Sequence, residues 1–153
     1  MVEFSENVTL AICGQLALGH GLKAISKMEG MPSKAAVFQW LMEGEAYKAA
    51  GQVDHPKAVF LDRYARAREA QADALAEEII EISDESTYDT ARDENGKVIV
   101  NMEHIQRDRL RVDSRKWLAG KLRPKKYGDK QTLEHTGTDG NAIAVDVQVT
   151  FGK

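Results

Sequence analysis

Five acidic residues are spaced so that their carboxylates could act together. Glu77, Glu78, Glu81, Asp84 and Glu85 all fall on one predicted long helix. Clustered carboxylates can hold two divalent metal ions for phosphodiester cleavage, so a metal-dependent nuclease is one hypothesis. We favour the alternative, a helix face that meets solvent or basic side chains, because runs of charge on a helix most often do so.

A second group of charged residues is basic. It comprises Arg107, Arg109, Arg111, Arg115, Lys116, Lys121, Arg123, Lys125, Lys126 and Lys130. Such a run can contact DNA phosphates, or it can pair with the acidic helix of the same or a neighbouring subunit. The net charge is −5 over residues 57–90 and +6 over residues 101–130. We favour pairing, which predicts a helical hairpin with complementary faces.

The familiar catalytic motifs are absent from the sequence. There is no GxxxxGK[ST] phosphate loop, no GxSxG and no HExxH, so the patterns for nucleotide binding, acyl transfer and zinc proteolysis are missing. The four histidines, His20, His55, His104 and His135, are scattered. Cys13 lies on an apolar helix face, where a small buried thiol is the usual role. We expect no catalytic residue, no metal and no cofactor.

Composition describes an ordinary globular protein. The 153 residues are 42% hydrophobic and 29% charged, and the net charge of −3 excludes a uniformly basic coat for nucleic acid. The single cysteine excludes a disulfide framework and fits a reducing compartment. The sequence has no apolar run of membrane-spanning length and no signal-peptide pattern at its start. We expect a cytoplasmic protein that does not engage a membrane.

Three helices are predicted in the first third of the chain, over residues 6–18, 22–28 and 33–43. Glycines break the chain between them, and Ser33 is expected to cap the third helix through its side-chain oxygen. A looser region is expected over residues 44–55. Two short helices split by a glycine-containing turn match a helix-turn-helix motif.

In a helix-turn-helix motif the second helix enters the major groove of DNA. Gln39 is expected to bond an adenine edge, and Lys34 a phosphate or a guanine. The predicted DNA contacts are Lys23, Lys27, Ser33, Lys34, Ala35, Gln39 and Lys48. Because this region has four lysines and no arginine, one copy should bind weakly, and several linked copies would bind through avidity.

A long helical hairpin is predicted next. Residues 57–86 lack glycine and proline and carry an apolar stripe at helical spacing, in a helix of about 45 Å. The stripe consists of Phe60, Tyr64, Ala67, Gln71, Ala74, Leu75, Ile79 and Ile82. A second helix over residues 101–122, capped by Asn101, has two apolar faces and therefore needs two neighbours. Between the helices, residues 87–100 are expected to form an exposed loop or a small β-ribbon.

Large apolar residues alternate with small or polar ones from Ile143 to Phe151, which predicts a strand, with a weaker strand at 129–135. An isolated β-hairpin is marginal in water. We therefore expect these strands to join those of other subunits, as in a closed barrel.

Four segments together resemble bacteriophage small terminase subunits. They are GMPS with VFQWL within residues 30–41, YARARE with AD within residues 64–73, RLRVDSRKW at 109–117 and PKKYGDK at 124–130. The block from 109 to 130 is the most specific of them. The resemblance covers most of residues 22–131.

The resemblance implies a mainly α protein in three parts: a helix-turn-helix DNA-binding domain (1–55), an antiparallel helical hairpin for oligomerisation (56–127) and a C-terminal β-strand segment (128–153) that builds an intersubunit barrel. Its implied partners are double-stranded viral DNA at the packaging-initiation site, the large terminase subunit and further copies of itself. We expect a ring of eight or nine subunits. The predicted oligomer interface comprises Phe60, Tyr64, Leu75, Ile79, Leu110, Trp117 and Leu118.

The implied function is the selection of viral DNA and the regulation of the ATPase and nuclease of the large subunit, in the host cell cytoplasm and without catalysis by the small subunit itself. The alternative is a dimeric helix-turn-helix transcriptional regulator. A regulator needs two recognition helices about one DNA turn apart, and it does not need the C-terminal strands.

Overall fold

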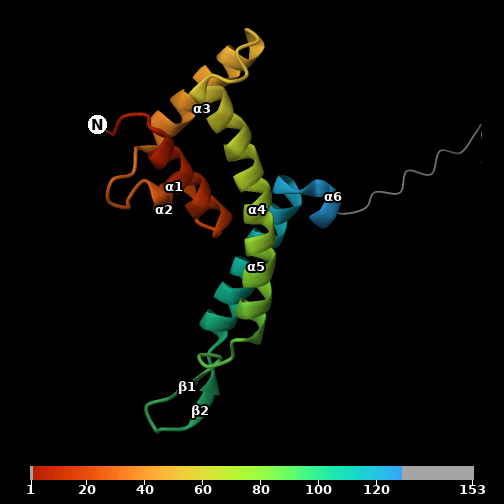
Figure 1. Ribbon diagram of the computed structural model, residues 1–153. Helices are drawn as coiled ribbons and strands as arrows, with labels where there is room; N and C mark the ends of the chain where they lie inside the picture. Colours follow the sequence, from red (N-terminus) through yellow and green to blue (C-terminus); the bar gives the residue numbers. More distant parts are fainter. Residues whose placement is uncertain (1, 129–153) are drawn as a thin grey trace, which may run out of the picture.

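The computed structural model describes residues 2–128 and is mainly helical (Figure 1). Its elements are α1 (Glu6–Ala17), α2 (Leu22–Ile25), α3 (Lys34–Ala49), α4 (Pro56–Asp84), β1 (Thr90–Arg92), β2 (Val98–Val100), α5 (Met102–Leu122) and α6 (Pro124–Tyr127). The predicted mainly α class is confirmed. The predicted strands at 129–135 and 143–151, and the barrel built from them, lie outside the described residues.

Helix α4 is the central helix of the molecule, and the other long helices pack against it (Figure 1). Helices α1 and α3 pack along its N-terminal half, and α5 runs back along its C-terminal half. The ribbon formed by β1 and β2 lies at the far end of this hairpin, and α6 returns to the middle of α4. One long helix therefore serves two separate packing units.

The N-terminal unit has its own apolar core. It is formed by Ile12, Leu16, Ile25, Val37, Trp40, Phe60 and Ala67. Phe4 packs edge-on against Trp40 with ring centroids 5.2 Å apart, a geometry that places a positive ring edge on a negative ring face. Phe60 and Ala67 come from α4, so burial of these two side chains anchors the helix-turn-helix region to α4.

The hairpin core is smaller and is built around Ala72, Leu75 and Ala119. Leu118, Leu122 and Tyr127 pack against it. Small residues at the centre let the two helix backbones approach closely. Ion pairs then follow the antiparallel register, with Glu78 opposite Arg115 and Asp73 opposite Arg123.

Helix α3 is longer than the sequence predicted. A looser region was expected to start at Gly44, yet the helix continues to Ala49. A β-carbon added at Gly44 would lie 2.3 Å from the carbonyl oxygen of Lys57. The glycine therefore provides room for the start of α4 to cross α3, and it does not end the helix.

Helix boundaries elsewhere differ by a few residues. Helix α2 ends at Ile25 and not at residue 28. Helix α4 begins at Pro56, since the fixed φ of proline suits the first helical position. The predicted cap at Asn101 is confirmed, with Oδ1 accepting the N–H of His104 at 3.3 Å. The small β-ribbon is also confirmed, with Ala91 paired to Ile99 in an antiparallel register.

Candidate nucleic-acid interface

The start of α3 is fixed by its cap. Ser33 has an extended backbone, and its Oγ accepts the N–H of Ala36 at 3.2 Å, as predicted. Val37 and Trp40 face the core, at 2% and 7% exposure. Burial of this inner face leaves the other side of the first two turns turned to solvent.

The outer face of α3 exposes Lys34, Ala35 and Gln39, all predicted DNA contacts. The Lys34 Nζ lies 5.5 Å from the centroid of the Phe38 ring, within the range of a cation–π contact. This contact keeps the cation on the exposed surface of the helix. Lys34 can therefore reach a phosphate without breaking an ion pair.

Gln39 already has a partner. Its Nε2 donates to the Glu43 Oε1 at 2.9 Å. The Glu43 carboxylate also pairs with Lys57, and the hydrogen bonds from Lys57 and then Gln39 lower the pKa of Glu43. To read a base edge, Gln39 must exchange its bond with this carboxylate for a bond to DNA.

The predicted flanking lysines differ in their surroundings. The Lys48 Nζ lies 2.6 Å from the Asp62 Oδ1, so an acidic residue of α4 offsets its charge. Lys23, Lys27 and Lys34 are exposed and form no ion pair with any other residue in the described part of the chain. Of the four lysines predicted to contact DNA, these three therefore carry a charge that no acidic residue within residues 2–128 offsets.

The basic run divides into paired and free residues. Arg115, Arg123 and Lys126 pair with α4, which confirms for these three the pairing that the charge pattern predicted. Two more pair within α5, Arg107 with Glu103 and Arg111 with Asp108. Arg109, Lys116, Lys121 and Lys125 are exposed and have no ion pair within residues 2–128. Lys130 lies outside the described residues.

Asp73 gathers three donors on one carboxylate. Lys126 donates to it at 2.9 Å, Tyr127 at 2.7 Å and Arg123 at 2.6 Å. Chiefly through the hydrogen bonds from Lys126 and Tyr127, this network lowers the pKa of Asp73 to about 2. The network joins the end of the hairpin to the middle of α4, so its role is structural.

The predicted interface residues occupy three environments. Phe60 and Leu75 are 1% and 6% exposed in the two cores, while Tyr64, Ile79 and Leu118 are partly buried. Leu110 and Trp117 are 67% and 65% exposed, so one of the two predicted apolar faces of α5 is left largely uncovered by residues 2–128. All seven remain predictions as interface residues, and Leu110 and Trp117 have the most side chain to offer.

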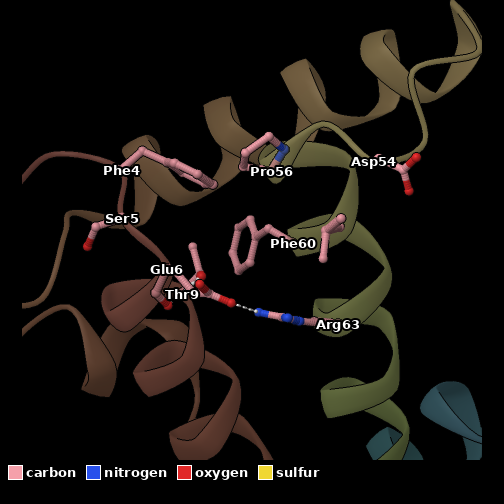
Figure 2. A pocket seen from close by; sticks show the side chains of 9 residues that line it. Phe4, Ser5, Glu6, Thr9, Asp54, Pro56, Phe60 and Arg63 are labelled. Carbon is pink, nitrogen blue, oxygen red and sulfur yellow. Dashed lines mark hydrogen bonds and ion pairs between the residues drawn. The ribbon is translucent and has the colours of Figure 1, made fainter.

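A cavity of about 510 Å³ lies between the N-terminal segment and α4 (Figure 2). Phe4 and Phe60 supply apolar walls, and the Arg63 Nη1 bonds the Glu6 Oε1 across it at 3.0 Å. The other lining residues are Ser5, Thr9, Asp54, Pro56 and Val59. These residues do not form a nucleophile–base pair, and the ion pair serves to fasten α1 to α4.

The five carboxylates of the nuclease hypothesis do not converge. Glu78 is held by Arg115, and Glu85 accepts the backbone N–H of Thr87 at 2.7 Å. Among the described residues, the group whose ligand atoms converge is Asp89, His104 and Asp108. Sequence reasoning missed this group, although His104 and Asp108 are four residues apart on one helix and so share a face.

The last two features are the thiol of Cys13 and the polarity of the helices. Burial raises the pKa of the Cys13 thiol, which opposes the thiolate that a nucleophile requires. Within residues 2–128, every helix is too short or too polar to cross a bilayer.

A helix-turn-helix unit on a long helical hairpin is the fold of a terminase small subunit. The chain belongs to the terminase small subunit-like family of bacteriophage Sf6, whose family model matches residues 4–134. A search of the curated proteins gave no match.

Solved structures agree with this family. Three crystal structures of single-substitution variants of terminase small subunit gp1 of the bacterial virus Sf6 are similar to the chain. Two are 35% identical, cover 98% of this chain and 96% of their own, and have TM-scores of 0.65 and 0.66. The third is 36% identical, covers 97% of this chain and 100% of its own, and has a TM-score of 0.65.

Proposed function

We propose that this protein recognises the packaging-initiation site on viral DNA as a homo-oligomeric ring, and that it recruits and regulates the ATPase and nuclease of the large terminase subunit. It acts in the host cytoplasm and is not itself a catalyst. The observation that carries the proposal is the outer face of α3, which exposes Lys34, Ala35 and Gln39 beside the Ser33 cap. Family membership supports the same role.

Several copies are needed because one copy is weakly charged. With Lys48 paired to Asp62, each subunit offers only a few free lysines near α3, and few phosphate contacts give weak binding at physiological salt. A ring raises the effective concentration of each further contact. The exposed Leu110 and Trp117 of α5 support an assembly through the hairpin, because large exposed apolar side chains often mark interaction sites.

DNA recognition is tested with the double variant Lys34→Ala and Gln39→Ala in a mobility-shift assay on viral DNA. We expect weaker site-specific binding with assembly unchanged. The matched control is Lys116→Ala, which removes an exposed cation from α5. A double variant that shifts DNA as the wild type does would contradict the assignment of α3 as the recognition helix.

The native mass of the purified protein tests the ring. One closed assembly of many subunits would support the packaging role. A monomer or dimer at micromolar concentration would instead favour the dimeric transcriptional regulator.

Docking to the large subunit is tested by removing residues 131–153. We expect the truncated protein to keep its DNA binding and to stimulate the large subunit's ATPase less. Equal stimulation by both forms would place the docking surface elsewhere.

A further inference from the structure

Three metal-ligating side chains converge where the β-ribbon joins α5. The His104 Nδ1 lies 3.5 Å from the Asp89 Oδ1 and 3.3 Å from the Asp108 Oδ2. The ligand atoms of the three residues all lie within 4.8 Å of one another. Asp89 comes from the segment just before β1, while His104 and Asp108 come from the first two turns of α5.

The imidazole nitrogen in this group lacks a partner. The His104 Nδ1 is the one buried side-chain nitrogen or oxygen atom in the described part of the chain that makes no hydrogen bond. A buried polar atom without a partner costs free energy. A neutral imidazole carries a proton on one nitrogen and a lone pair on the other. With the lone pair on Nδ1, this atom can bind a metal ion that lies between it and the two carboxylates.

Hydrogen bonds to neighbouring groups hold the three ligands in place. The carbonyl of Asp89 accepts the N–H of Asn101 at 2.7 Å, and the Asn101 Oδ1 accepts the N–H of His104. Arg111 donates to the Asp108 Oδ1 at 2.9 Å, which leaves the Oδ2 directed at the imidazole. Partners of this kind orient the ligands of a metal site.

We propose that Asp89, His104 and Asp108 bind one divalent transition-metal cation of the Zn²⁺ type. One imidazole nitrogen and two carboxylate oxygens suit this class of metal. Metal–ligand bonds of about 2.0–2.2 Å place tetrahedral ligands roughly 3.3–3.6 Å apart, and the two distances to Nδ1 match this spacing. Water would complete the coordination.

The site is open enough for a cation to enter. The side chains of Asp108, His104 and Asp89 are 14%, 24% and 39% exposed. Bound metal would join the imidazole and the two carboxylates through bonds to one centre. It would clamp the ribbon to the first turns of α5 and so stiffen the tip of the hairpin. This inference does not depend on the proposed role in packaging.

The test is calorimetric titration of the chelator-treated full-length protein with Zn²⁺. We expect one site per chain, with Mg²⁺ binding far more weakly because it prefers oxygen ligands and retains its water. His104→Gln and Asp108→Asn should each weaken Zn²⁺ binding by about tenfold or more. The matched control, His20→Gln, removes an exposed histidine from the N-terminal unit and should leave the affinity unchanged.

Two further measurements guard against a misfolded variant. Asp89→Asn keeps the backbone carbonyl that bonds Asn101, so its circular dichroism should match the wild type while its Zn²⁺ affinity falls. Co²⁺ should give visible absorption bands with the wild type and with His20→Gln, but not with His104→Gln. Absence of Zn²⁺ binding, or binding unchanged in folded His104→Gln, would overturn the proposal.

Discussion

The hydroxyl of Tyr127 donates to the Oδ1 of Asp73 at 2.7 Å, across 54 positions of sequence. Asp73 lies near the middle of α4, and Tyr127 ends α6, just after the hairpin. Arg123 and Lys126 join the same carboxylate. One acidic side chain thus fastens the end of α5 and α6 to the middle of α4.

Asp73→Asn should destabilise the protein at neutral pH and have less effect in acid. The pKa of Asp73 is about 2 in the folded protein against an ordinary 3.8. Because folding lowers this pKa, the charged carboxylate contributes its full stability above about pH 4–5, and the contribution is lost as the pH falls towards 2. Urea unfolding of wild type and variant across this range measures the difference. The same dependence with Asp113→Asn, an exposed acid on α5, would contradict the assignment.

Gln71→Met should cost about 1–3 kcal/mol of unfolding free energy. Gln71 is 1% exposed, and its Nε2 donates to the carbonyls of Gly19 at 3.2 Å and His20 at 2.9 Å. Methionine keeps the volume but leaves both carbonyls without this donor. Chemical unfolding measures the loss, with Gln106→Met on the exposed side of α5 as control. Equal stability of the two variants would show that water replaces the amide.

The helices could be predicted from the sequence, but the side-chain contacts between them could not. Periodicity placed Gln71 on the apolar stripe of the long helix, and it is buried there. It is buried as a donor to the turn after α1, however, and spacing along one helix carries no information about a carbonyl 51 residues away. The cap at Ser33 was predictable because all its atoms lie within one turn.

At Gly44 the local sequence signal led to a wrong prediction, because the helix does not end there. Locally a glycine weakens a helix, so ending the helix there was reasonable from the sequence. The reason for the glycine is the backbone of Lys57, which passes where a β-carbon would lie. A close approach between helices is a tertiary property, and one sequence does not reveal it.

Gly44→Ala should therefore destabilise the protein, by about 1–3 kcal/mol, as overpacking does. The matched control is Gly14→Ala in α1, where an added β-carbon meets no atom within 4 Å. That substitution should stabilise the protein by up to about 1 kcal/mol, because alanine favours the helix. Thermal unfolding of the two variants would settle the point. Stabilisation by both substitutions would contradict the close approach of α3 and α4.

The sequence alone indicates which residues are candidates to contact DNA, but it does not show which of them are already paired with an acidic residue. All seven predicted DNA contacts lie in the N-terminal unit, but Lys48 and Gln39 have acidic partners in the structure. Asp62, the partner of Lys48, is 14 residues further along the chain, on α4. A count of charges gives Lys48 and Lys34 the same expected contribution to DNA binding, whereas the ion pair with Asp62 reduces the contribution of Lys48.

Asp62→Asn should strengthen DNA binding, because it releases Lys48 and removes a negative charge. Lys34→Ala should lower the slope of log K against log[salt] by about one, as expected for one lost phosphate contact. Lys48→Ala in the wild-type background should change that slope less, and more when combined with Asp62→Asn. Fluorescence anisotropy at several salt concentrations measures the slopes. Equal effects of Lys48→Ala in both backgrounds would mean that the ion pair does not limit Lys48.

Trp117→Ala should weaken assembly without weakening the fold of the single chain. The side chain is 65% exposed on α5, with the Lys121 Nζ 5.9 Å from its ring centroid, so its truncation removes little buried surface within one subunit. A tryptophan at the centre of an interface typically contributes about 2 kcal/mol or more. Sedimentation velocity should therefore show smaller species at low concentration, with helix content unchanged. Met42→Ala removes a side chain of α3 that is 71% exposed, and it should leave the assembly intact. Sedimentation of Trp117→Ala identical to wild type would place the subunit contacts on another face.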